Sequence, residues 1–355
     1  MAQLLLETER TAKLNQVIND FFEQSIADAT DIDPSYRQLW ETLYGLIQSG
    51  GKRLRPFMTL LAYEAFGGKN TEKMISVAAA QELLHFCLLI HDDVIDRDYI
   101  RYGVPNVAGR YKEVYSKFVT DVDDQKHYAH GAAILGGDLI LSGAHQLIAS
   151  SDLDSKQKMI AQQLLSRSIF EVAGGELLDT ESSFVPYTAG DALKIAKYKT
   201  ASYSFISPLM TGARLATISS EQITALHTYA LSLGIAYQLV DDLLGVFGNT
   251  DETGKSTSSD ITEGKRTFMV EQAMSVMTAS DKTVFDNAFG NPKASSSEIQ
   301  QVKQILESTG ARSITEQAVT DYADKAHRAL AELSLDEQYH TQFDALIRKV
   351  TERSF

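Results

Sequence analysis

The sequence has one cysteine and no long uninterrupted apolar run. The single cysteine, Cys87, excludes an intrachain disulfide and a cysteine-rich zinc site, which fits a reducing cytoplasm. The first fifteen residues contain only the short apolar run Leu4, Leu5 and Leu6, so we expect no secretory signal peptide. No stretch reaches the roughly 18 apolar residues of a membrane span. The sequence therefore predicts a soluble, cytoplasmic protein without a membrane span.

Positive charge is also scarce. The 355 residues include 33 Lys and Arg against 47 Asp and Glu, which gives a formal net charge of −14. A chain of this charge repels phosphate backbones, so we expect no nucleic-acid partner. It can still bind a phosphorylated small molecule where a few basic side chains and a bound cation reverse the local field.

Proline is rare as well, and the apolar pattern is helical. Only 6 prolines occur, and apolar residues recur at helical spacing in residues 77–88 and 233–240, whereas strand-like alternation is scarce. Short stretches rich in Gly, Ser or charge separate such segments, and the helical spacing resumes after each one. We therefore predict an all-α protein folded as one large helical bundle, a single domain over residues 1–355.

Two apolar segments carry adjacent aspartates. The first reads L-L-I-H-D-D-V-I-D and holds Asp92, Asp93 and Asp96; the second reads Y-Q-L-V-D-D-L-L-G and holds Asp241. Asp92 and Asp96 share one helical face, where like charges destabilise an isolated helix by about 0.2–0.5 kcal/mol. Magnesium, which prefers one or two carboxylates plus substrate phosphates, would offset that repulsion. One such pair more often marks a solvated helix end, but two favour a metal cluster between facing helices.

Basic residues gather at expected loops and helix ends. Residues 50–56 read G-G-K-R-L-R-P, and these three cations beside a turn suit a diphosphate. Residues 248–256 resemble a phosphate-binding loop, but five residues separate the glycines where that motif has four. We interpret this segment as a mobile lid that carries Lys255. The other cations at such places are Arg101, Lys199 and Lys265.

Five segments in order resemble the trans-isoprenyl diphosphate synthases over residues 50–267. They read G-G-K-R-L-R-P, L-L-I-H-D-D-V-I-D, K-Y-K-T, Y-Q-L-V-D-D-L-L-G and G-K-R-T. The resemblance implies an isoprenoid synthase fold, a large antiparallel helical bundle around a central active-site cavity, assembled as a homodimer. It implies a transferase that extends an allylic diphosphate with isopentenyl diphosphate.

The resemblance also assigns residues. Those that would bind isopentenyl diphosphate are Gly51, Lys52, Arg55 and His85. Those that would bind Mg²⁺ are Asp92, Asp93, Asp96 and Asp241. Those that would surround the allylic diphosphate are Arg101, Lys199, Thr200, Gln238, Lys255 and Lys265. The aspartates with Lys199 and Lys255 would be catalytic, because they would stabilise charge on the departing pyrophosphate.

This chain departs from the family pattern at two positions. After the first aspartate segment the family usually has two arginines and a glycine, but this chain reads Arg101, Tyr102, Gly103. Tyrosine donates a hydrogen bond but carries no positive charge, so we expect weaker binding of isopentenyl diphosphate. The second segment ends at Gly245, where many relatives have a third aspartate, a position that the family holds loosely. Residues 118–131, acidic and histidine-bearing, are predicted to form a longer loop.

Product length should depend on residues one and two helical turns before Asp92. These residues are Leu84, Cys87 and Leu88. Short-chain family members often carry an aromatic ring there, and Phe86 lies one position too close to Cys87 to share its face. We therefore predict a product of about twenty carbons or more.

Two other functions and three plain structural roles stay open. A terpene cyclase ionises the same allylic diphosphates, although it needs no segment like residues 50–56. A noncatalytic partner subunit would explain Tyr102. His85 could be a core histidine, Gln238 an internal helix hydrogen-bonder and Thr200 a helix cap. The preferred starter and the need for a second subunit are also open.

Overall fold

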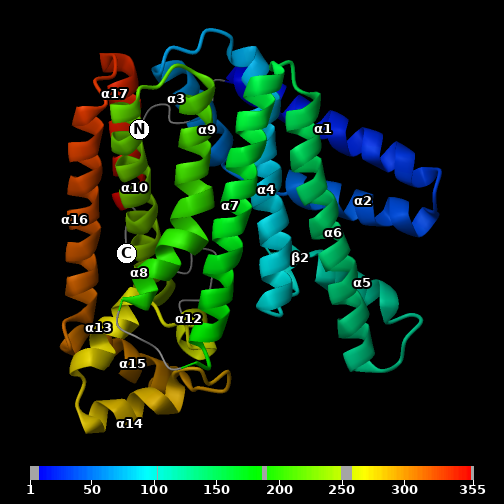
Figure 1. Ribbon diagram of the computed structural model, residues 1–355. Coiled ribbons are helices and arrows are strands. Elements are labelled where there is room, and N and C mark those ends of the chain that lie inside the picture. Colours follow the sequence, from blue (N-terminus) through cyan, green and yellow to red (C-terminus); the bar gives the residue numbers. More distant parts are fainter. Residues whose placement is uncertain (1–7, 102, 186–189, 249–257, 353–355) are drawn as a thin grey trace. The chain divides into compact units, whose positions relative to one another are not determined.

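The computed structural model describes residues 8–101, 103–185, 190–248 and 258–352 (Figure 1). Helices dominate these residues, which confirms the prediction of an all-α protein. The first half contains α1 (Thr8–Thr30), α2 (Pro34–Gln48), α3 (Leu54–Ala65), the 3-10 helix η1 (Thr71–Met74), α4 (Ile75–Ile95), α5 (Val107–Tyr115), α6 (Val122–Ser150) and α7 (Ser155–Ser182). A small antiparallel hairpin pairs β1 (Ile100–Arg101) with β2 (Val104–Pro105).

The second half is again helical, and it includes a π-helix. It contains α8 (Asp191–Ile195), the π-helix η2 (Ala196–Ile206), α9 (Ser207–Leu215), α10 (Ser220–Phe247), α12 (Ser259–Glu263), α13 (Phe268–Val276), α14 (Ala279–Ala288), α15 (Ser296–Ser308), α16 (Ala311–Glu332) and α17 (Glu337–Thr351). Because π-helices are rare and often occur at functional sites, η2 draws attention to the residues that it carries.

The contacts along the chain define two compact units. The N-terminal unit comprises Met1–Leu165 and Thr211–Thr217, and the C-terminal unit comprises Ser166–Met210 and Ile218–Phe355. Two borders fall inside α7 and α9, and the third falls between α9 and α10. The single domain expected from the sequence therefore stays a prediction, and each unit is described by itself.

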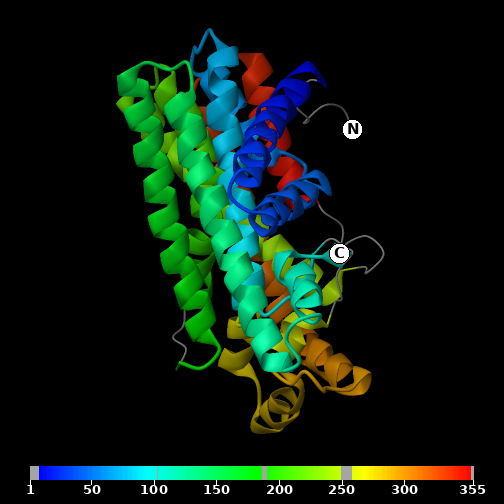
Figure 2. The ribbon, with the colours of Figure 1, turned by 90° about the vertical axis from the view of Figure 1, so that its right-hand side faces the viewer.

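The N-terminal unit is built around α4. This helix is apolar on nearly every side and is buried along most of its length, as expected for a helix in a bundle core. Helix α6 runs beside it (Figure 2). Helices α1 and α2 form a hairpin in which Phe22 packs against both Trp40 and Tyr44. Asp33 caps α2, whose first residue is Pro34, so the turn chemistry defines where this helix begins.

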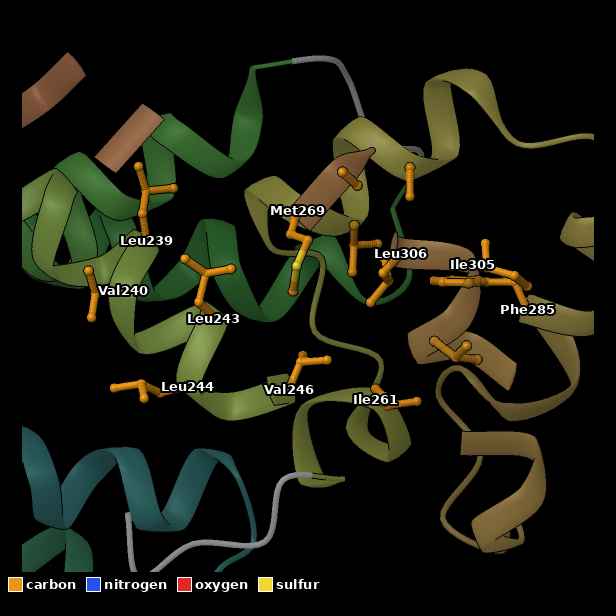
Figure 3. Close-up of a cluster of buried hydrophobic side chains, with 14 of the residues drawn as sticks. Leu239, Val240, Leu243, Leu244, Val246, Ile261, Met269, Phe285, Ile305 and Leu306 are labelled. Atoms are coloured by element: carbon orange, nitrogen blue, oxygen red, sulfur yellow. The ribbon is translucent and has the colours of Figure 1, made fainter. Parts of the chain in front are cut away.

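The C-terminal unit is built around the antiparallel pair α10 and α16. At one end of the pair Gln222 donates a hydrogen bond to the Leu333 carbonyl, and at the other Arg312 lies over the Phe247 ring. A cluster of apolar side chains extends this core toward α13, α14 and α15 (Figure 3). Its members include Leu239, Val240 and Leu243 of α10, Met269, Phe285, Ile305 and Leu306. The second aspartate segment therefore lies on a helix that is anchored in a core.

Three helices within the described residues are long and apolar enough to cross a membrane, judged by length and composition alone. They are residues 71–95, 122–150 and 220–247. Between 50% and 67% of the most apolar window in each is buried inside the protein. The expected absence of a membrane span stays a prediction.

Candidate functional site

A pocket in the N-terminal unit lies beside the turn between α2 and α3. It encloses roughly 510 Å³ of space, counting its open mouth. Its wall includes Gly51 and His85, two of the residues expected at isopentenyl diphosphate, while Lys52 and Arg55 are not among its lining residues. The other charged groups of the wall are Arg53, Glu82, Asp93 and Arg101. The wall thus carries two arginines and two carboxylates, and Arg53 pairs with Glu82 while Arg101 pairs with Asp93.

His85 is expected to be neutral in this pocket. The surrounding protein desolvates the ring, and Arg55, Arg101 and Arg53 repel a proton on it, so the pKa of His85 lies well below its usual value. A neutral imidazole still donates one hydrogen bond, which suits a diphosphate oxygen. His85 is among the residues that line the pocket, and both its proposed ligand role and the alternative of a core histidine stay predictions.

The first aspartate segment forms the last turn of α4. Asp93 is 4% exposed, and burial raises its pKa, an effect that the neighbouring Arg101 opposes. The Arg101 guanidinium reaches Asp93 with N to O distances of 2.6 and 2.8 Å and lies 3.5 Å from Asp92. Asp96 follows the helix as its C-cap residue and is exposed. Arg101 therefore pairs with Asp93 and lies close to Asp92.

The residues expected to set product length lie on the buried part of α4. Leu84 is 0% and Cys87 1% exposed, and Leu88 is half-buried. The Cys87 sulfur lies 3.8 Å from His91 Nδ1, and burial raises the pKa of Cys87 to about 12. A thiol with this pKa stays protonated, so Cys87 acts through its size rather than its reactivity.

The C-terminal unit brings Lys199 to a pair of carboxylates. Lys199 lies in η2, and its Nζ is 3.0 Å from Glu176 and 2.5 Å from Asp179, both on α7. The sequence analysis did not identify either carboxylate. The two carboxylates are three residues apart on α7 and come just after Gly174 and Gly175. That spacing was the available signal, but it is common in helices.

Thr200 and Gln238 also meet in this unit. The Thr200 hydroxyl donates to the Gln238 side-chain oxygen, and Gln238 Nε2 donates to Asp242 at 2.8 Å. Thr200 thus lies inside η2 and does not cap a helix, which differs from the plain structural role considered for it. Gln238 does make the hydrogen bond along its own helix that was considered as its alternative role.

The second aspartate segment also carries one buried and one half-buried aspartate. Asp242 is 8% exposed, and its pKa is raised well above the usual value by burial and by the negative charges of Asp260, Asp241 and Asp179. Asp241 is half-buried. Carboxylates in such a group repel one another unless a cation or a proton joins them.

Gly245 lies directly against the Asp260 carboxylate. A Cβ added at Gly245 would lie 2.0 Å from Asp260 Oδ2, so the Asp260 carboxylate occupies the space beside the position where many relatives have a third aspartate. Asp260 is 17% exposed at its side chain and lies 3.4 Å from Lys265, which also pairs with Glu263. The sequence analysis overlooked Asp260.

Three expectations fall on residues that need separate comment. Tyr102 and Lys255 lie outside the described residues, so their roles stay predictions. The prediction of a loop over residues 118–131 is wrong from residue 122 onward, because α6 begins there. Asp121 accepts hydrogen bonds from the first amides of α6, and acidic residues in that turn favour a helix start.

The residues that the structure describes contain no preformed metal cage. Within the described part of the chain, no three His, Cys, Asp or Glu side chains are close enough together to hold a metal ion. Magnesium usually takes only one or two carboxylates and completes its shell with water and phosphate oxygens, so the aspartates present fit it. Burial is the main cause of the raised pKa values of Asp93 and Asp242, and a bound cation would offset it by stabilising the charged carboxylates.

Comparisons with known proteins agree with this chemistry. The polyprenyl synthetase family profile matches residues 37–306. A geranylgeranyl diphosphate synthase of Sulfolobus acidocaldarius is 31% identical over 296 residues, which cover 81% of this chain and 84% of the relative. A geranylfarnesyl diphosphate synthase of Aeropyrum pernix is 30% identical and covers 87% of this chain and 92% of its own length.

Solved structures give the same result for the fold. A geranylgeranyl pyrophosphate synthase from Corynebacterium glutamicum, in complex with isoprenyl diphosphate and magnesium, superimposes with a TM-score of 0.91 and 29% identity. The match covers 99% of this chain and 100% of that chain. The expected isoprenoid synthase fold is thereby confirmed.

Proposed function

Because this chain belongs to the polyprenyl synthetase family, we propose that it joins isopentenyl diphosphate to an allylic diphosphate and releases pyrophosphate. The relatives named above make geranylgeranyl and geranylfarnesyl diphosphates, so the product has twenty carbons or more. The observation that carries the proposal is the pocket beside Gly51 and His85. A terpene cyclase needs no separate site for an extender diphosphate, whereas a chain-extending enzyme does.

The extender diphosphate binds at the turn before α3. Gly51 offers a backbone that can approach an anion closely, and Lys52 and Arg55 supply charge-assisted hydrogen bonds. His85 adds a neutral donor from the pocket wall, which its lowered pKa supports. Tyr102 adds no charge, so we expect weaker extender binding than in relatives with arginine there.

The aspartates bind magnesium. Asp92, Asp93 and Asp96 form one group and Asp241 belongs to the other. Asp92 lies within 3.5 Å of the Arg101 guanidinium, and Asp93 is closer still, so Arg101 must move or share these carboxylates when a cation enters. Bound magnesium would neutralise the diphosphate oxygens and make pyrophosphate a better leaving group.

Lys199, Thr200, Gln238 and Lys265 bind the allylic diphosphate. Lys199 is held by Glu176 and Asp179, which orient its ammonium group. Lys265 is 43% exposed at its side chain, so a diphosphate can reach it. Lys255 and Arg101 are assigned to the same diphosphate because of the sequence segments in which they lie.

The reaction then needs no side-chain nucleophile. The allylic C–O bond breaks, pyrophosphate leaves with the bonding electrons, and the lysines donate hydrogen bonds to the charge that develops. The isopentenyl double bond supplies the electron pair for the new C–C bond. Loss of a proton to the departing pyrophosphate restores a double bond and gives a longer allylic diphosphate. Leu84, Cys87 and Leu88 limit how far its tail extends.

The test is product analysis with defined starters. The purified protein is incubated with magnesium, isopentenyl diphosphate and geranyl, farnesyl or geranylgeranyl diphosphate, and products are identified by mass spectrometry. We expect five-carbon additions that fall at least about 100-fold in Asp92→Ala, because a lost metal ligand weakens leaving-group stabilisation. Asp123→Ala, on the exposed first turn of α6, is the matched control. A folded wild type that elongates no starter would make a noncatalytic partner subunit or a cyclase the better reading.

We also propose that the enzyme is a cytoplasmic homodimer. Ile134 and Leu135 on α6 are 46% and 60% exposed, and Phe170 and Leu177 on α7 are 70% and 58% exposed. Ile134 and Leu135 are neighbours on α6, and exposed apolar side chains of this size are candidates for an interface. The free thiol of Cys87 fits a reducing compartment.

A further inference from the structure

The turn that precedes α3 contains an unusual backbone conformation. Arg53, the N-cap residue of α3, has φ 49° and ψ 38°, which is the left-handed region that side chains other than glycine rarely adopt. Gly51, two residues earlier, has φ 124°. A strained residue of this kind persists only where the surrounding structure holds it in place. Something must therefore stabilise Arg53.

The Arg53 side chain supplies that stabilisation. Its Nη1 donates to Glu82 Oε1 at 2.8 Å, and its Nη2 donates to the Ile47 carbonyl at 3.2 Å. The pair is buried, because the two side chains are 14% and 5% exposed. One guanidinium thus ties together the end of α2, the turn and the middle of α4.

The pair also touches the turn directly. A Cβ added at Gly51 would lie 2.9 Å from Arg53 Nη1 and 3.3 Å from Glu82 Oε1, so the guanidinium and the carboxylate lie against the Gly51 backbone. Arg53 and Glu82 both line the pocket, and Glu82 precedes His85 by three residues on the same helix. The geometry of Gly51 and the orientation of this pair are therefore linked.

Glu82 has a second oxygen that bears on ligand binding. Glu82 Oε2 is buried and has no hydrogen-bond partner among the described residues, and the residue is only 4% exposed. A buried carboxylate oxygen without a donor normally indicates a water or ligand group in the adjoining space. The adjoining space here is the pocket.

We propose that Arg53 and Glu82 form a positioning pair that holds the turn at residues 50–52 in the shape that binds the extender diphosphate. The inference rests on the proposed binding of isopentenyl diphosphate at this turn. Neither residue transfers a proton or an electron. Their ion pair maintains the left-handed conformation at Arg53 and thereby fixes the position of the Gly51 amide and the direction of Lys52.

Glu82→Gln separates this proposal from a simple charge effect. The substitution removes a negative charge from a pocket that binds an anion, so electrostatics alone would lower KM for isopentenyl diphosphate. The positioning pair predicts the opposite, because the buried guanidinium loses its counter-charge and the turn loosens. We expect KM for isopentenyl diphosphate to rise about tenfold while KM for the allylic starter changes less than about twofold.

Arg53→Lys is the second variant. It keeps the positive charge but loses the fork that reaches Glu82 and Ile47 together, so we expect a similar rise in KM. In the double variant the effects should not add, because both changes break one interaction. Glu64→Gln is the matched control, since Glu64 pairs with Arg10 at 2.9 Å between α1 and α3 and is not among the pocket's lining residues. It should leave both KM values unchanged.

Calorimetric titration with isopentenyl diphosphate provides a readout that does not depend on turnover. If the wild type binds the extender but elongates nothing, the proposed reaction fails, while weaker binding to Glu82→Gln still supports the positioning pair. Far-ultraviolet circular dichroism checks that each variant is folded. If Glu82→Gln does not fold, the binding measurement is made with Arg53→Lys instead. Unchanged or tighter binding in a folded Glu82→Gln protein overturns the inference.

Discussion

Asp242 is a single residue that keeps a destabilising charge inside the C-terminal unit. It is 92% buried, and Asp179, Asp241 and Asp260 add negative charge around it. Its pKa is raised in the folded protein, so the folded state binds a proton more tightly than the unfolded chain does. Stability from this residue is therefore present at low pH and is lost as pH rises through the unfolded pKa and toward the folded one.

Asp242→Asn should consequently raise the stability of the folded protein and lower its enzymatic activity. The amide keeps an oxygen that can accept from Gln238 but carries no charge, so we expect the free energy of unfolding at neutral pH to rise by about 1–2 kcal/mol. Urea unfolding at neutral pH and near pH 5 measures this, and the gain should shrink at the lower pH. Asp123→Asn on the surface should change neither. Lower stability in Asp242→Asn at neutral pH would contradict the role of burial.

Sequence reasoning found the residues whose type and spacing carry meaning by themselves. Asp92, Asp96 and Asp241 stand out because carboxylates are rare in apolar helices. Glu82 and Asp260 do not stand out in the sequence. Glu82 matters because it pairs with Arg53, 29 residues away, and Asp260 matters because it lies against Gly245. Such pairings are tertiary, and no local pattern reports them.

At the scale of elements, α10 and α12 meet at Gly245. The Cβ of an alanine there would require the Asp260 carboxylate to move, and the three nearest atoms all belong to that one flexible side chain. Alanine is also the better helix former by about 1 kcal/mol, which offsets the shift. The helix should therefore tolerate Gly245→Ala. The Asp260 side chain should be displaced by it.

We expect Gly245→Ala and Asp260→Ala to lower the rate of elongation to a similar extent, with no change in the circular dichroism spectrum. The double variant should lose no more than either single variant, because both act on one carboxylate. Steady-state kinetics of the three variants tests this. Full activity in Gly245→Ala with a defect in Asp260→Ala would show that the carboxylate can work from another position.

Helical periodicity predicted the existence of the elements better than their limits. The apolar spacing on α4 and α10 is strong because both are buried on most sides. The first residues of α6 are acidic and polar, which favours a loop, although the same residues suit a capped helix start. The π-helix η2 has no sequence signal of its own, since its hydrogen-bond register depends on packing.

At the scale of the whole chain, a net charge of −14 coexists with binding of anionic substrates. The basic residues are few, but the pocket wall holds Arg53 and Arg101 together, and η2 carries Lys199. Each is paired with a carboxylate, so the protein keeps these basic groups ordered without a strongly positive surface. The sequence predicted both the family and the fold, but not the division into two compact units, because chain contacts and not composition define it.

The exposed apolar face of α6 leads to a prediction about assembly. Leu135 is 60% exposed and adjoins Ile134, which is 46% exposed, so a homodimer that covers them buries apolar area. Leu135→Glu would place a charge in that interface, and we expect it to convert the dimer into monomers in light scattering after size exclusion. Ile32→Glu is the control, because Ile32 is 72% exposed in the turn between α1 and α2. A wild type that is monomeric at micromolar concentration, or a Leu135→Glu protein that stays dimeric, would exclude this face of α6 as the interface.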